Sequence, residues 1–238
     1  MAFPDLAPIG ALIADPTRAA MLAELIDGHV LTAGDLAART GVTAQTASWH
    51  LSKLVEGGLL AVVRQGRHRY HRLAGPHVAE ALEGLGALAP MPKVRDRFDR
   101  EVLSGLRFAR SCYGHLAGWL AVAIRDRFLA MGLIVPVGIE HDVTTAGESW
   151  FWRIGVDVEA ARASRRSFAR ACVDWSERRP HLAGALGDAL LAALVERGWI
   201  LCHRGERAVE LSEAGRVWVT RSLGLDLSDD QRAAPELA

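Results

Sequence analysis

The segment from residue 36 to residue 60 constrains the fold more than any other part of this chain. It reads as a short helix, a tight turn at Gly41, a second helix and an abrupt stop at Gly57-Gly58. The apolar residues recur at spacings that close one small core across two crossed helices. These core positions are Leu36, Ala37, Val42, Ala47, Leu51 and Leu54. The pattern predicts two short helices packed across a turn.

The second of these helices leaves a polar face outside that core. Thr43 precedes the helix as a candidate N-cap. The side chains that remain outward are Gln45, Thr46, Ser48, Trp49 and Lys53. Hydrogen-bonding, stacking and cationic groups suit the major groove of DNA better than water alone. We therefore expect this helix-turn-helix to read DNA.

A β-hairpin is predicted directly after the second helix. Residues 59–63 are apolar, Gln65-Gly66 forms a turn, and a basic segment follows from residue 67 to residue 73. Between residues 39 and 72 the cations are Arg39, Lys53, Arg64, Arg67, Arg69 and Arg72, against the single anion Glu56. Phosphate contacts need such a local concentration of positive charge. The hairpin is therefore expected to act as a basic wing beside the helix-turn-helix.

The composition limits the other function classes. The formal net charge is zero and the pI is about 7.1, so affinity for nucleic acid must come from a local patch. The N-terminal residues do not show the basic region and following apolar run that are typical of a signal peptide. Charged residues or glycines interrupt every apolar stretch before it is long enough to cross a bilayer. The three cysteines are widely spaced. We expect free thiols, a cytoplasmic location and no membrane partner.

The chain is predicted to hold two domains. Helical patterns precede the helix-turn-helix from residue 8 to residue 28, with Asp15 as a cap, and another helix follows over residues 76–88. The Pro90-Met91-Pro92 stretch then marks a boundary, and a charged helix is expected from Lys93 to Arg110. The prediction is a DNA-binding and dimerisation domain over residues 1–90 and a sensory or dimer-extending domain over residues 91–238.

The second domain contains an internal repeat. Phe108-Ala109-Arg110-Ser111-Cys112 recurs as residues 168–172, and His115-Leu116-Ala117-Gly118 recurs as residues 181–184. Each copy, about 105–157 and 165–226, is interpreted as helix, longer helix, strand, turn, strand and capped helix. The second copy has a six-residue insertion near residues 174–179. We expect a mainly α fold with small β-hairpins, in which two winged-helix-like repeats pack about a pseudo-twofold axis.

The repeat places cysteine and histidine side chains in equivalent positions. Cys112 and His115 are three residues apart, which would put them on one face of a helix. Cys172, with Asp174 or His181, is the equivalent set. Thiolate and imidazole ligands from both copies could meet and bind a transition metal. The alternative is that the cysteines are small core residues and the histidines only make hydrogen bonds, since a duplicated fold duplicates its packing residues.

Tryptophan is concentrated in the second domain. The residues are Trp119, Trp150, Trp152, Trp175, Trp199 and Trp218. They could line an aromatic pocket for a small organic effector, with Trp119 and Trp175 beside the Cys/His sets. The alternative is that they are core and interface residues. No nucleophile elbow, phosphate-binding glycine loop or His-Glu-x-x-His motif suggests an enzyme.

Residues 8–88 resemble the ArsR/SmtB family of winged-helix transcriptional repressors. The resemblance rests on residues 15–18, on Ser48-Trp49-His50-Leu51 and Leu54, on Gly58-Leu59-Leu60, and on Gly66-Arg67-His68-Arg69-Tyr70. It implies a homodimer whose first and last helices form the interface and whose recognition helices enter successive major grooves of an imperfect palindrome. It also implies that Thr43, Gln45, Thr46, Ser48 and Trp49 face the groove and that Arg64, Arg67 and Arg69 face the backbone.

The departures from that family concern His50, Trp49 and the sensor. His50 either touches a phosphate or forms hydrogen bonds inside the domain. Trp49 stands where such proteins commonly have Arg, which favours contact with thymine methyl groups. The metal-ligand patterns of the family are missing from residues 29–32 and from the helix over residues 76–88. A sensor is therefore expected in the second domain.

These observations predict a sequence-specific DNA-binding regulator, most simply a homodimeric repressor that an effector releases from DNA. The effector is a metal ion or a small organic molecule. Its candidate residues are Cys112, His115, Trp119, Cys172, Trp175 and His181. The alternatives are a metal- or thiol-responsive sensor built on the cysteines and histidines, and an architectural DNA binder without an effector. No catalytic residues are assigned.

Overall fold

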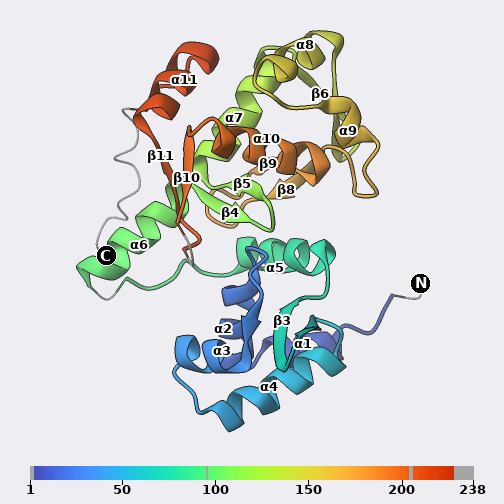
Figure 1. Cartoon of the computed structure of the whole chain (residues 1–238), viewed down its shortest axis with the longest axis vertical. Helices are drawn as coiled ribbons and strands as arrows, with labels where there is room; N and C mark the ends of the chain where they lie inside the picture. Colours follow the sequence, from blue (N-terminus) through green and yellow to red (C-terminus); the bar gives the residue numbers. More distant parts are fainter. Residues whose placement is uncertain (1–2, 95, 204–205, 228–238) are drawn as a thin grey trace. The chain divides into compact units, whose positions relative to one another are not determined.

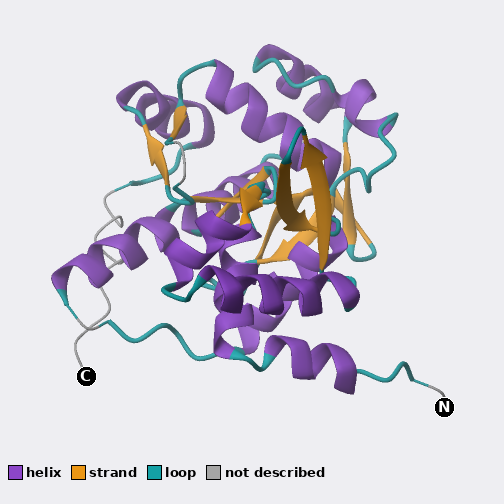
Figure 2. Ribbon diagram, turned by 60° about the horizontal axis from the view of Figure 1, so that its bottom comes forward, coloured by secondary structure: helices purple, strands orange, loops and turns teal. Residues whose placement is uncertain are grey.

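The computed structural model describes residues 3–94, 96–203 and 206–227. These residues form two compact units, Met1–Leu82 and Glu83–Ala238, each with its own helices and antiparallel strands (Figures 1 and 2). Among the described residues no helix is long and apolar enough to cross a membrane.

Unit 1 is a winged helix-turn-helix. Its elements are α1 (Ala7–Ile13), α2 (Pro16–Leu25), β1 (Leu31–Thr32), α3 (Ala33–Thr40), α4 (Ala44–Glu56), β2 (Leu60–Gln65), β3 (His68–Leu73) and the beginning of α5 (Pro76–Leu88). The strands form one antiparallel sheet in the order β1-β3-β2. The predicted helix-turn-helix and wing are therefore confirmed, with Gly66-Arg67 as the two residues between the wing strands.

Local sequence signals explain why these helices begin and end where they do. The Asp15 side chain accepts a hydrogen bond from the backbone N–H of Arg18, and Thr43 accepts one from Thr46, so each caps its helix. Gly41 adopts φ 68°, a left-handed conformation that ends α3 and lets the chain turn into α4. The core between the two helices contains Leu36, Ala37, Ala47, Leu51 and Leu54, all buried as predicted.

The two units divide inside helix α5, between Leu82 and Glu83. The sequence placed this boundary after residue 90, at the proline-rich stretch. The difference has a physical cause, because Glu83 is buried and its carboxylate lies 3.0 Å from the guanidinium of Arg110 in unit 2. The C-terminal half of α5 therefore belongs to unit 2 by its contacts.

Unit 2 continues after α5 with two segments that have the same element order. The first contains α6 (Arg97–Phe108), β4 (Arg110–Cys112), β5 (His115–Ala117), α7 (Trp119–Ala130), β6 (Ile134–Val137), β7 (Glu140–Val143) and α8 (Thr145–Arg153). The second contains α9 (Val158–Arg162), β8 (Arg170–Val173), β9 (Pro180–Ala183), α10 (Gly184–Glu196), β10 (Ile200–Cys202), β11 (Val209–Leu211) and α11 (Glu213–Leu223).

The prediction of two successive helices at the start of each copy is wrong. A helix is followed there by a short β-hairpin, β4–β5 in one copy and β8–β9 in the other. In the first copy the chain reverses at Tyr113-Gly114, where both residues have positive φ, 48° and 113°. Such a turn matches the twist of a tight hairpin. In the second copy the connection is residues 174–179, where the sequence indicated an insertion.

Each copy extends the hairpin of the other. The N–H of His141 in β7 donates to the carbonyl of Ala169, and the N–H of Val209 in β11 donates to the carbonyl of Ala109. These equivalent contacts build the sheet β6-β7-β8-β9 and place β11 beside β4 through the bridge between Arg110 and Ala208. The two copies therefore pack on one another within a single chain.

Most of the tryptophans of unit 2 pack in or against its hydrophobic core. Trp199 and Trp218 stack with ring centroids 4.6 Å apart, and Trp150 contacts both Trp218 and Phe128. These rings pack in or against the main hydrophobic core of the unit. Trp152 instead is 74% exposed. Their arrangement favours the core interpretation over an aromatic effector pocket.

Candidate functional site

The polar face of helix α4 is exposed in unit 1, as the sequence predicted. Thr43, Gln45, Thr46, Ser48 and Trp49 all lie at the surface, and Trp49 is 56% exposed although it is the largest side chain of the helix. The Ser48 hydroxyl donates to the carbonyl of Ala44. This face therefore offers amide and hydroxyl groups and an aromatic ring to a partner.

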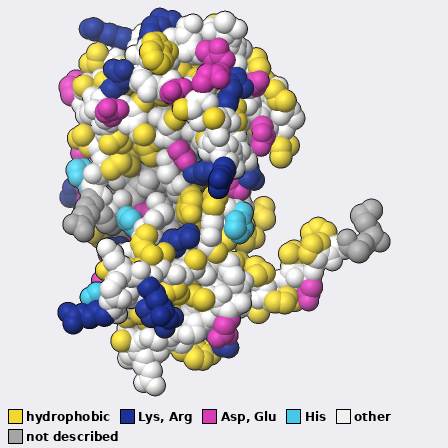
Figure 3. All heavy atoms as spheres, turned by 45° about the vertical axis from the view of Figure 1, so that its right-hand side comes forward, with side chains coloured by type: hydrophobic (Ala, Val, Ile, Leu, Met, Phe, Trp, Pro, Cys, Tyr) yellow, Lys and Arg dark blue, Asp and Glu magenta, His cyan; other side chains and the backbone are white. Residues whose placement is uncertain are grey.

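Positive charge lies beside this face on the wing. Arg64, Arg67 and Arg69 are exposed, and Arg64 is directly opposite Arg69 in the β2–β3 register. None of the three forms an ion pair within residues 3–94, 96–203 and 206–227. Like charges facing one another across two strands are unfavourable unless an anion lies near. In Figure 3 dark blue Lys and Arg side chains project from the lower part of the view, on unit 1, and others are spread over the upper part.

Two of the predicted DNA-contacting residues have partners inside the protein. His50 is buried, with its Nδ1 atom 3.6 Å from a carboxylate oxygen of Asp15 and 3.5 Å from the Arg18 guanidinium. It therefore links α4 to α2, and its prediction as a DNA contact is corrected. Lys53 is exposed and forms an ion pair of 3.0 Å with Glu56. Such a surface pair is weak and can yield to a phosphate.

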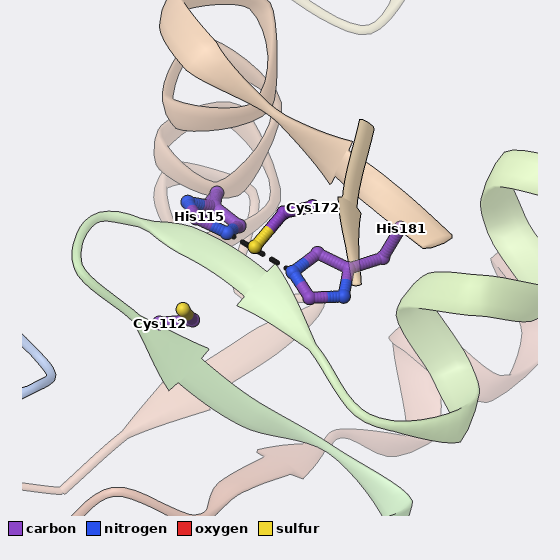
Figure 4. A group of neighbouring side chains, drawn as sticks. All are labelled: Cys112, His115, Cys172 and His181. Atoms are coloured by element: carbon purple, nitrogen blue, oxygen red, sulfur yellow. Dashed lines mark hydrogen bonds between the residues drawn. The ribbon is translucent and has the colours of Figure 1, made fainter. Parts of the chain in front are cut away.

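Unit 2 contains a buried cluster of four side chains that bear potential metal ligands. Cys112 faces His115 across β4 and β5, and Cys172 faces His181 across β8 and β9. The ligand atoms of all four lie within 4.8 Å of one another, and the two imidazole Nε2 atoms are 3.0 Å apart (Figure 4). The sequence named these four residues, but on helices. The hairpins bring them together because opposite residues of a strand pair share one face of the sheet.

Two carboxylates lie behind the imidazoles. Asp174 Oδ2 is 3.3 Å from His181 Nδ1, and Asp188 Oδ1 is 3.9 Å from His115 Nδ1. The sequence treated Asp174 as an alternative ligand, whereas the structure places it outside the cluster. Asp188, on α10, was not identified from the sequence. Each histidine thus directs Nε2 toward the cluster and Nδ1 toward a carboxylate.

The protonation of these groups reflects their surroundings. A hydrogen bond with Cys172, together with burial, raises the pKa of the Cys112 thiol to about 12. Burial alone would raise the pKa of Asp174, but hydrogen bonds and the Arg110 guanidinium hold it well below its usual range. Burial opposes the charged form of His181, whereas its contacts with Asp174 and Cys112 raise its pKa. Without a bound cation, the Cys112 thiol therefore favours its protonated form.

Asp174 also belongs to a buried ion-pair network. Arg110 Nη2 lies 2.9 Å from Asp174 Oδ2 and 3.0 Å from Glu83 Oε2, and the three side chains are fully buried. The Arg110 guanidinium lies over the Trp175 ring, 4.7 Å from its centroid. The sequence analysis missed Arg110 and Glu83. A signal was present for Glu83, which follows the buried Ala79 by one helical turn and so shares its face.

The two tryptophans predicted beside the effector have other contacts. Trp119 stacks on Phe108 with centroids 5.8 Å apart. The Trp175 ring packs against the guanidinium of Arg110, which pairs with Asp174 beside His181. Neither ring is among the four residues whose ligand atoms converge.

The exposed polar face of α4 and the basic wing define a winged-helix DNA-binding protein. Comparisons with known proteins specify the family. A helix-turn-helix domain model matches residues 13–63. The chain is 39% identical over 224 residues to YdfF of Bacillus subtilis (strain 168), named an HTH-type transcriptional regulator, and the match covers 94% of this chain and 99% of that protein. The HTH-type transcriptional regulator CmtR of Mycobacterium tuberculosis is 44% identical over 77 residues, which cover 32% of this chain and 64% of CmtR.

Solved structures align only in part. The cadmium metal-sensor CmtR from Mycobacterium tuberculosis has 39% identity and a TM-score of 0.32, covering 39% of this chain and 100% of that one. A homodimeric winged helix-turn-helix DNA-binding domain from Mycobacterium bovis has 30% identity and a TM-score of 0.33, covering 35% and 76%. The near full-length match to YdfF establishes the family. The chain belongs to the HTH-type transcriptional regulators and binds DNA.

Proposed function

We propose that this regulator is a homodimeric repressor that reads an imperfect palindrome and leaves it when an effector binds unit 2. The observation that carries the DNA-binding part is the exposed face of α4 together with the three unpaired arginines of the wing. The groove-facing residues would be Thr43, Gln45, Thr46, Ser48 and Trp49, with Arg64, Arg67 and Arg69 on the backbone. A regulator of transcription acts where DNA is, so we also propose a cytoplasmic location.

The electrostatics support a polyanion as the partner of the wing. Arg64 and Arg69 face each other across the hairpin without an intervening carboxylate. Their mutual repulsion is relieved when a phosphate lies between or beside them. Because the whole chain has no net charge, binding depends on this local patch and is sensitive to salt.

Helix α1 supports a dimer. It has seven residues, none of them buried, and its flanking and internal side chains Leu6 and Ile9 are 61% and 36% exposed. A seven-residue helix without a fully buried side chain is marginal in water. A second copy of the chain would cover these residues, and the ArsR/SmtB resemblance implies the same helix. Two recognition helices held this way would reach half-sites about 34–36 Å apart.

The test is fluorescence anisotropy on a selected operator and on a scrambled duplex at several salt concentrations. Arg67→Ala should weaken binding to both duplexes and reduce the salt slope by about 1 for each phosphate that is no longer neutralised. Gln45→Ala should reduce the preference for the operator. Arg153→Ala, an exposed arginine of α8 in unit 2, is the matched control and should change neither.

Two results would overturn the proposal. Equal behaviour of Arg67→Ala and Arg153→Ala would remove the wing from the interface. Equal affinity of the wild type for operator and scrambled DNA would favour an architectural role without sequence preference.

A further inference from the structure

We propose that Cys112, His115, Cys172 and His181 form a four-coordinate site for a thiophilic divalent cation of the Zn²⁺ and Cd²⁺ type. The inference deepens the proposed function, because it names the chemical class of the effector. The site itself does not depend on DNA binding, so metal binding can be measured without DNA.

The geometry fits a tetrahedral ion after a small contraction. With metal–nitrogen distances of about 2.0 Å and metal–sulfur distances of about 2.3 Å, tetrahedral ligands lie roughly 3.3 to 3.8 Å apart. The two Nε2 atoms are 3.0 Å apart, and no pair of ligand atoms exceeds 4.8 Å. Each ligand therefore needs to move by less than about 1 Å to reach a common centre.

The donor set selects the kind of ion. Two thiolates and two imidazoles are soft and borderline ligands, which favour Zn²⁺, Cd²⁺ or Co²⁺ over Mg²⁺ or Ca²⁺. All four side chains are buried. A closed site with four protein ligands leaves no position for a reacting water, so it suits sensing or structure and not metal catalysis.

The surroundings of the histidines also favour a metal over simple packing. Within the described residues, the Nδ1 atoms of His115 and His181 are buried and make no hydrogen bond. Each lies beside a carboxylate, Asp188 or Asp174. A neutral imidazole that binds a metal through Nε2 carries its proton on Nδ1, which can then be donated to such a carboxylate. Each carboxylate also pairs with an arginine, Asp188 with Arg166 and Asp174 with Arg110, and its additional contact with Nδ1 orients the imidazole toward the cluster.

A route from the site to helix α5 is present in the same contacts. Asp174 contacts both His181 and Arg110, and Arg110 contacts Glu83 on α5. Helix α5 is continuous across the division between the two units. Movement of His181 onto a metal changes its contact with Asp174 and hence the position of Arg110 against Glu83. Glu83→Gln should therefore weaken the effect of metal on DNA affinity while leaving metal binding intact.

The experiment uses the full-length protein, prepared reduced and metal-free, with Co²⁺ as the probe. We expect one Co²⁺ per chain, with the visible bands of a tetrahedral ion and a thiolate-to-cobalt charge-transfer band in the near ultraviolet. Zn²⁺ added in equal amount should displace it. Cys112→Ser and Cys172→Ser should each weaken the charge-transfer band and lower Zn²⁺ affinity. Cys202→Ser is the matched control, because Cys202 is an exposed free cysteine outside the cluster.

Further variants keep the test decisive if a cysteine variant does not fold. Asp188→Asn leaves every ligand in place and should reduce Zn²⁺ affinity by about 10- to 100-fold. Absence of a thiolate band in the wild type would overturn the site. The site would also be overturned if DNA affinity changed only when mass spectrometry detected a disulfide between Cys112 and Cys172.

DNA binding is then measured with and without Zn²⁺. A fall in operator affinity on adding Zn²⁺, absent in Cys112→Ser, supports the metal as effector. Metal binding without any change in DNA affinity would overturn that role and leave the site. Loss of operator preference in the metal-free protein would instead overturn the proposed function, so the two failures are distinguishable.

Discussion

Replacing Arg110 by Met tests the buried network of unit 2 most directly. The arginine is fully buried between Asp174 and Glu83, and its guanidinium packs on Trp175. Asp174 would keep other donors, namely the N–H groups of Gly118, Ser176 and Glu177. Among the described residues, the cation left to Glu83 would be the more distant Arg207, at 3.4 Å. Most of the cost therefore falls on the carboxylate of Glu83.

The expected magnitude is large. Removing one partner of a buried ion pair costs about 3–5 kcal/mol, because the other charge stays buried without compensation. With a urea slope of about 2 kcal/mol per molar, the unfolding midpoint should fall by roughly 1.5 to 2.5 M. Tryptophan fluorescence is a suitable assay, since all tryptophans except Trp49 lie in unit 2.

The control and the rescue decide the interpretation. Arg153→Met removes an exposed arginine of α8 and should stay within about 0.5 kcal/mol of the wild type. Combining Glu83→Gln with Arg110→Met removes the uncompensated charge and should recover a large part of the stability. If Arg110→Met unfolds at the midpoint of Arg153→Met, the buried network contributes nothing and the reasoning is refuted.

Three further predictions concern single positions. Gly215→Ala would press a Cβ atom against the carbonyl oxygen of Trp199 and should clearly lower the urea midpoint of unfolding. Gly84→Ala has open space at its Cβ and should raise helix stability by about 1 kcal/mol. Equal midpoints for the two variants would contradict this packing. The pKa of Asp174 is lowered in the folded state, so the ionised carboxylate stabilises the fold above the unfolded pKa, and this stabilisation is lost as pH falls through the folded pKa. Urea midpoints measured from pH 7 to pH 3 should therefore fall less steeply in Asp174→Asn than in the wild type. Thr43→Ala removes the cap of α4 and should cost about 1 kcal/mol, seen as faster hydrogen exchange in that helix; unchanged exchange would show that the cap is dispensable.

The sequence predicted unit 1 well because its signals are local. The caps at Asp15 and Thr43 and the turn at Gly41 depend on residues within one helical turn of each other. The exposed residues of α4 that we propose face the groove follow from the same periodicity. His50 was the ambiguous case, and its partners Asp15 and Arg18 lie far away in sequence, where periodicity carries no information.

Unit 2 was harder to predict because its site depends on long-range pairing. Strands β4 and β5 have only three residues each, too short for a period of two to be recognised. The repeat grouped Cys112, His115, Cys172 and His181, whose ligand atoms the structure brings together, but its element assignment put them on helices. The boundary after residue 90 had the same weakness, since only the contact between Glu83 and Arg110 moves it into α5.

The distribution of the carboxylates between the two copies separates a ligand site from inherited packing. Each copy supplies one cysteine and one histidine from equivalent hairpins, which a duplicated core would also do. Both carboxylates, however, come from the second copy and have no counterpart in the first. Asp174 lies in the insertion, and Asp188 corresponds to Val122 when the two His-Leu-Ala-Gly motifs are aligned. Repetition therefore does not account for a carboxylate beside each Nδ1, and carboxylates in these two positions fit imidazoles that bind a metal through Nε2.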